Sequence, residues 1–116
     1  MQTAYVVVVL TTAIVTAGVA IADLIPAGFV LANSAEVGVP RSWLTPLAAL
    51  KLAGAAGLIV GLLGLPALGI AAAAGLVLFF VGAVVTHVRA GVLYNIAFPG
   101  GYLLLSTASL VLMVVH

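Results

Sequence analysis

The sequence contains no cysteine and has very few charged side chains. Charged residues make up 4% of the 116 residues, whereas they account for about 25% of a soluble domain. Because cysteine is absent, the chain forms no disulfide bond and offers no thiol, which excludes an intrinsic thiol-disulfide oxidoreductase activity. The formal net charge of +1 rests on three basic and two acidic residues and so indicates no particular class of partner, and we expect no nucleic-acid partner.

Long apolar runs fill the chain instead, and 66% of its residues are hydrophobic. A helix needs about 20 apolar residues to cross ~30 Å of hydrocarbon. Runs of this length predict four membrane spans, at about residues 3–22, 43–64, 66–88 and 92–115. Residues 24–41 are too polar and too rich in proline and glycine to cross, which predicts an interfacial loop or a short helix between the first two spans.

The fold class follows from the needs of the backbone. In hydrocarbon every N–H and C=O group must find an internal partner, which a helix supplies and an open sheet edge does not. The sequence therefore predicts an all-α integral membrane protein, a four-transmembrane-helix bundle that forms a single domain over residues 1–116.

The few charged residues fall toward one side of this predicted bundle. Short connections make neighbouring helices antiparallel, so the segments that follow the first and third spans share one side, with Asp23, Glu36, Arg41 and Arg89. Lys51 lies toward the same side, and the opposite side carries no charged side chain. Because basic residues favour the cytoplasm, we expect this side to be cytoplasmic and both termini to be extracytoplasmic.

Small and polar residues follow one face of each predicted helix at 100° per residue. Membrane helices approach closely through small residues, so we expect helix packing at Gly54, Gly57, Gly61, Gly64, Gly75 and Gly82. The polar stripes of the first and fourth spans fit either packing or the lining of a pocket; they consist of Tyr5, Thr12, Thr16 and Asp23, and of Asn95, Tyr102, Ser106 and Ser109. The spacing leaves both interpretations open.

Lys51 is the one charged side chain inside an apolar run. If Trp43 marks the interface, Lys51 lies about 12 Å deeper, where a charged lysine costs roughly 3 kcal/mol. One interpretation is that its side chain snorkels to the lipid headgroups. The other is that it pairs with Asp23, or alternatively with Glu36, in the polar floor of a cavity that opens to the charged side.

Six polar residues are candidates for such a pocket: Asp23, Lys51, Asn95, Tyr102, Arg89 and His87. The two histidines, His87 and His116, fall near opposite sides of the bilayer and cannot share a metal within one chain, so we expect no metal site. The sequence matches no hydrolase, metalloprotease or phosphate-loop motif. We therefore assign no catalytic residue and favour a protein without an enzymatic activity of its own.

Three segments of the chain resemble the DoxX-like family of small bacterial four-helix membrane proteins. They are "GVPRSWL" ahead of the second span, the lysine within "ALKLAGAAGL", and "GAVVTHVRA" at the end of the third span. The resemblance covers effectively the whole chain and implies the four-helix fold and the bacterial cytoplasmic (inner) membrane. The family is named for a subunit of an archaeal thiosulfate:quinone oxidoreductase, and distant eukaryotic relatives act as assembly chaperones for receptor channels. No catalytic residue carries over; the motif positions are Asn33, Pro40, Lys51, His87 and Arg89.

Two hypotheses from different functional classes follow. The one that we favour from the sequence is an accessory or chaperone-like subunit, whose glycine-rich faces pair with a second copy or with a partner membrane protein. The alternative is a quinone- or lipid-binding subunit of a membrane redox system, in which the candidate pocket surrounds the headgroup. A transporter or channel would require several copies to form a path across the membrane.

Overall fold

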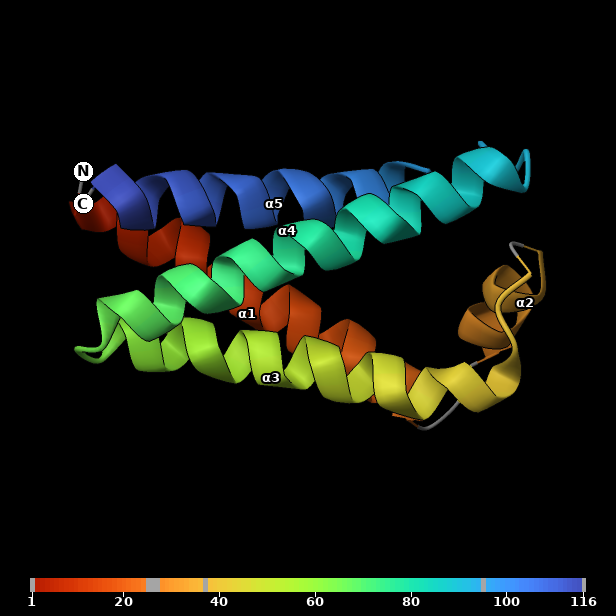
Figure 1. Ribbon diagram of the computed structural model, residues 1–116, viewed down its shortest axis with the longest axis horizontal. Coiled ribbons are helices and arrows are strands. Elements are labelled where there is room, and N and C mark those ends of the chain that lie inside the picture. Colours follow the sequence, from red (N-terminus) through yellow and green to blue (C-terminus); the bar gives the residue numbers. More distant parts are fainter. Residues whose placement is uncertain (1, 25–27, 37, 95, 116) are drawn as a thin grey trace.

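Four long helices and one short helix make up the described part of the chain, residues 2–24, 28–36, 38–94 and 96–115 of a computed structural model (Figure 1). The elements are α1 (Gln2–Leu24), α2 (Gly28–Glu36), the 3-10 helix η1 (Arg41–Trp43), α3 (Leu44–Leu62), α4 (Pro66–Arg89) and α5 (Ala97–Val115). Each of the four long helices is long and apolar enough to cross a membrane. The predicted fold class is therefore confirmed, and a short helix, α2, lies between the first two spans.

Proline and glycine mark the helix boundaries. Pro66 is the first residue of α4, where the N–H that proline lacks has no helical partner to lose. Gly91 follows α4 with a φ of 71°, which allows the chain to turn away from the helix axis. The last helix begins at Ala97 rather than at residue 92, so Pro99 occupies its first turn and leaves the helix straight.

Each of the four long helices packs against two others, and the pairing differs between the two ends of the bundle. α1 and α4 each pack against both α3 and α5. In Figure 1, α4 runs from α3 at the left to α5 at the right, and α1 crosses behind it in the opposite sense. The left end holds the start of α1 and the end of α5. At the right end, α1 and α3 form one pair and α4 and α5 form another, and α2 lies beyond the gap between the two pairs.

α3 and α4 come closest beside the turn that joins them. A Cβ atom on Gly61 would lie 2.6 Å from Gly69 Cα, and a Cβ atom on Gly57 would lie 2.5 Å from Ala72 Cβ. Such distances leave no space for a larger residue, so the two backbones pack directly against each other. Gly69 was not among the expected packing glycines, although its backbone meets Gly61 directly.

Three of the expected packing glycines lie outside this contact. An added Cβ atom would meet no atom within 4 Å at Gly64, Gly75 or Gly82. Gly64 lies in the turn between α3 and α4, where its φ of 132° favours glycine. On α4 the face toward α3 carries Gly69 and Ala72 and is rotated from the face that carries Gly75 and Gly82. The sequence did not predict this face, because spacing along one helix does not reveal which face meets a neighbour.

Beyond the glycine contact, larger side chains separate α3 from α4. Leu76 fills the space that Gly54 leaves, with its Cδ2 atom 2.5 Å from where a Cβ would stand. About one turn further, Lys51 faces Phe79, and its Nζ lies 5.5 Å from the centre of the ring. The contacting residues of α4 thus grow from glycine through alanine and leucine to phenylalanine. This gradient makes the two helices diverge toward α2, as Figure 1 shows.

α1 and α5 are joined by buried hydroxyl groups near the middle of the bundle. Thr12 Oγ1 lies 2.8 Å from Val8 O and 2.8 Å from Ser109 Oγ. A third partner, Leu105 O of α5, lies 3.2 Å from the same hydroxyl, and either hydroxyl can donate in the contact with Ser109. Thr12 of the polar stripe on α1 therefore packs against α5, whereas the last member of the stripe, Asp23, lies at the diverging end beside Lys51.

Candidate functional site

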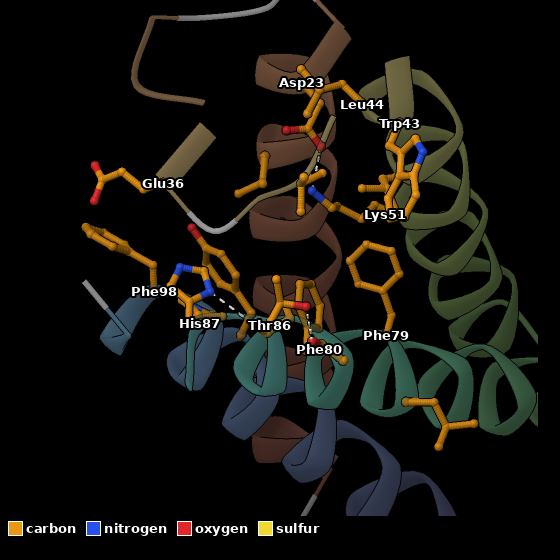
Figure 2. Close-up of a pocket in the computed structure, with 18 of the residues that line it drawn as sticks. Asp23, Glu36, Trp43, Leu44, Lys51, Phe79, Phe80, Thr86, His87 and Phe98 are labelled. Atoms are coloured by element: carbon orange, nitrogen blue, oxygen red, sulfur yellow. Dashed lines mark hydrogen bonds and ion pairs between the residues drawn. The ribbon is translucent and has the colours of Figure 1, made fainter. Parts of the chain in front are cut away.

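A cavity of about 930 Å³ occupies the diverging end of the bundle (Figure 2). Pockets for small molecules usually measure about 300–1,000 Å³. All four long helices, α2 and two connections contribute side chains to its wall: Val19, Asp23, Ala32, Glu36, Val39, Trp43, Leu44, Leu47, Lys51, Leu78, Phe79, Phe80, Gly82, Ala83, Thr86, His87, Tyr94, Phe98, Pro99 and Tyr102.

Local sequence on α4 leaves room for this cavity. Gly82 and Ala83 are two of the smallest residues, and they follow the bulky Phe79 and Phe80. Both small residues line the cavity, and a Cβ atom on Gly82 would meet nothing within 4 Å. Phe79 holds α4 away from α3, and the small residues leave the resulting space open.

An ion pair lies in the cavity wall. Lys51 Nζ donates a hydrogen bond to Asp23 Oδ2 at 2.5 Å, which links the first half of α3 to the end of α1. The two side chains are only 10% and 5% exposed, respectively, so water does little to stabilise either charge alone. Of the two counter-charges that the sequence allowed for Lys51, the structure selects Asp23 rather than Glu36.

Aromatic side chains gather around the cavity. Among the aromatic side chains that the structure describes, six line it: Trp43, Phe79, Phe80, Tyr94, Phe98 and Tyr102. Phe80 lies between Phe79 and Tyr102, with ring centres 5.2 Å and 5.4 Å away. Figure 2 shows Trp43 and Phe79 beside Lys51, and Phe98 near His87. The wall therefore offers several flat apolar faces next to one ion pair.

His87 is a buried member of the wall, on the last turn of α4. Its Nδ1 atom lies 2.9 Å from Ala83 O. Because a carbonyl oxygen only accepts, Nδ1 carries a hydrogen in this contact, which fixes the orientation of the ring. Within the described ranges, no three histidine, aspartate or glutamate residues are grouped as a metal site would require.

One hydrogen bond ties α2 to the connection between α4 and α5. Tyr94 donates its hydroxyl hydrogen to Glu36 Oε1 at 2.6 Å. The hydrogen bond to the carboxylate raises the pKa of Tyr94 above its usual value of 10.0, since loss of the proton would break the bond and place two negative charges together. Both residues line the cavity, so this bond holds α2 over one end of it.

The structure brings together four of the six residues that the sequence singled out for a polar pocket. Asp23, Lys51, His87 and Tyr102 line the cavity. Arg89 is exposed and does not line it, because it follows His87 by two positions and points to another side of α4.

Three further predicted positions have a limited description. Asn95 lies outside the described residues. Asn33 lies within α2, and Pro40 is an exposed residue just before η1.

Sequence reasoning missed most of the aromatic wall and the bond between Glu36 and Tyr94. The available signal was the clustering of aromatic residues near the ends of the apolar runs, as in Trp43 before the second span and Tyr94 after the third. Such residues are ordinarily assigned to the membrane interface, and only the fold shows that they face a common space.

Comparison with known proteins gives one match. The sequence model of the DoxX-like family matches residues 6–109, which cover α3 and α4, most of α1 and α5, and every residue of the cavity wall. No curated protein and no solved structure matches the chain significantly.

Proposed function

The chain belongs to the DoxX-like family, and we propose that this multi-pass membrane protein binds an amphipathic small molecule, a quinone or another lipid, in the cavity at the α2 end. The observation that carries the proposal is a ligand-sized cavity that combines an apolar, aromatic wall with one buried ion pair. Small-molecule sites have this composition: apolar surface supplies affinity and a few fixed polar groups supply orientation.

The polar groups are placed to orient a headgroup. Lys51 has hydrogens left after its bond to Asp23, because an ammonium group carries three. Tyr102 lines the cavity with a hydroxyl, which both donates and accepts. A carbonyl or hydroxyl on a ligand finds partners in these groups, while Trp43 and Phe79 provide faces for a ring or a hydrocarbon chain.

The geometry supports this function better than the accessory role that the sequence favoured. That role depended on glycine faces that would pair with another protein. Gly54, Gly57 and Gly61 are instead occupied by α4 of the same chain. A second copy or a partner membrane protein would have to use other surfaces, so oligomerisation is a separate question from binding in the cavity.

We further infer the setting of this binding. The membrane is the bacterial cytoplasmic membrane, as the family implies. The α2 end faces the cytoplasm and the termini face outward, because Lys51 and Arg89 lie toward the α2 end and basic residues favour the cytoplasmic side.

Native mass spectrometry of protein extracted gently from its own membrane tests the proposal. We expect a retained molecule of quinone or lipid mass on the unaltered chain. The Lys51→Met/Asp23→Asn double variant removes both charges together, so the bundle keeps no unpaired charge while the polar head loses its partner; we expect it to retain less of the same molecule. Protein that carries no small molecule, or equal retention by both proteins, would contradict the proposal.

A further inference from the structure

We propose that the ligand reaches the cavity sideways from the bilayer, between α3 and α4, and that it is a lipophile with an uncharged head whose chain lies in this lateral opening. The inference rests on the proposed binding function and adds the route and the charge of the ligand.

The opening follows from the divergence of α3 and α4. Trp43 and Leu47 line the cavity from the α3 side, and Leu78 and Gly82 line it from α4. Trp43 is 55% exposed and Leu78 is 73% exposed, so the protein covers neither residue. The cavity wall therefore continues onto the outer surface of the bundle between these two helices.

The depth of this opening places it in hydrocarbon. Gly82 precedes Arg89, the last residue of α4, by seven positions, and Leu78 precedes it by eleven. At 1.5 Å per residue they lie about 10 Å and about 16 Å below the end of the helix. Half of the hydrocarbon core measures about 15 Å, so the opening extends nearly to the bilayer midplane. A route at this depth admits molecules that dissolve in lipid and excludes water-soluble ones.

The other route, from the aqueous side, passes α2. Ala32 and Glu36 of α2 line that end of the cavity, and the hydrogen bond from Tyr94 to Glu36 holds α2 in place. A ligand from the aqueous side would pass the charged Glu36 and its bond to Tyr94, whereas a ligand from the bilayer would meet only apolar residues, Trp43, Leu47 and Leu78, between α3 and α4.

The charge of the wall argues against an anionic headgroup. Among the described side chains, Lys51 is the one cation in the wall, and Asp23 already neutralises it. Glu36 adds a negative charge at the α2 end. A phosphate head would meet no free cation there, whereas an uncharged head that accepts a hydrogen bond fits beside Lys51.

Photolabelling distinguishes the two routes. A quinone with an uncharged ring and a photoreactive diazirine at the end of its chain is added to the protein in lipid nanodiscs. After irradiation, labelled residues are mapped by mass spectrometry with and without excess unmodified quinone. We expect labelling that the excess quinone abolishes at Leu47, Leu78 and Gly82. Labelling at Gly75, which faces outward on the same helix without lining the cavity, is the control and should not respond to competition.

The outcomes separate this inference from the proposed function. Binding of the quinone is followed independently by quenching of Trp43, the one tryptophan of the chain. Saturable quenching with competed labelling at Ala32 and Val39 instead of the opening would overturn the lateral route and leave the binding function intact. Saturable quenching by phosphatidylglycerol with a brominated acyl chain, but not by the quinone, would overturn the uncharged head. Quenching by neither lipid would overturn the proposed function itself.

Discussion

Lys51 Nζ lies 2.5 Å from Asp23 Oδ2, and this pair joins α1 to α3 at the side of the bundle where α1 ends and α3 begins. Lys51 is seven residues into α3, about 10 Å below its start. At that depth a charge needs a partner, and Asp23 reaches it from the last turn of α1. The pair is therefore both a link between α1 and α3 and the polar element of the cavity.

Breaking this pair should destabilise the protein more than removing both charges. Lys51→Met leaves Asp23 buried without its partner, and we expect the free energy of unfolding to fall by about 3 kcal/mol. The double variant Lys51→Met/Asp23→Asn should recover most of this loss, because no charge remains in the apolar bundle. Thermal unfolding in detergent, followed by circular dichroism, gives the order of stability. A single variant as stable as the unaltered chain would mean that Lys51 reaches the headgroups and does not depend on Asp23.

The contact between α3 and α4 should tolerate no added methyl group. Gly61→Ala places a Cβ atom 2.6 Å from Gly69 Cα, where backbone cannot move aside, and we expect a loss of about 1–3 kcal/mol. Gly75→Ala is the matched control on α4, since its Cβ atom meets nothing within 4 Å. It should leave the melting temperature unchanged or raise it slightly. Equal effects of the two substitutions would show that the glycine contact does not determine how closely α3 and α4 pack.

The bond between Tyr94 and Glu36 should appear in the titration of Tyr94. The pKa of Tyr94 is raised because its hydroxyl donates to a carboxylate. The folded pKa therefore exceeds the unfolded value of 10.0, and the stability that the bond contributes is complete below pH 10.0 and lost as pH rises through the folded pKa. Ultraviolet absorbance of tyrosinate measures this, with Tyr94→Phe to assign the transition. Glu36→Ala should lower the pKa toward 10.0; an unchanged titration in that variant would contradict the bond.

The four spans could be predicted from the sequence because hydrocarbon thickness sets their length. The partner of Lys51 could also be predicted, since the sequence has few charged residues and Asp23 lies at a similar depth in the bundle. The contact face of α4 was not, because a periodic pattern gives angles within one helix and leaves its rotation against a neighbour open. The roles of Trp43 and Tyr94 depend on how α2 and the connections fold back over the bundle. The spacing of residues in the sequence does not predict this arrangement.

Quenching of Trp43 fluorescence by decylubiquinone in lipid nanodiscs tests the central claim most directly, because the one tryptophan lines the cavity. Three proteins are compared: the unaltered chain, Gly82→Leu, which adds a bulky side chain at the cavity wall, and Gly75→Leu, which adds the same side chain on the same helix away from it. We predict saturable quenching in the unaltered chain and in Gly75→Leu, and at least about tenfold weaker binding in Gly82→Leu, or roughly 1.4 kcal/mol. Quenching that rises linearly and equally in all three proteins would show that the quinone only dissolves in the surrounding lipid and would contradict a ligand site in the cavity.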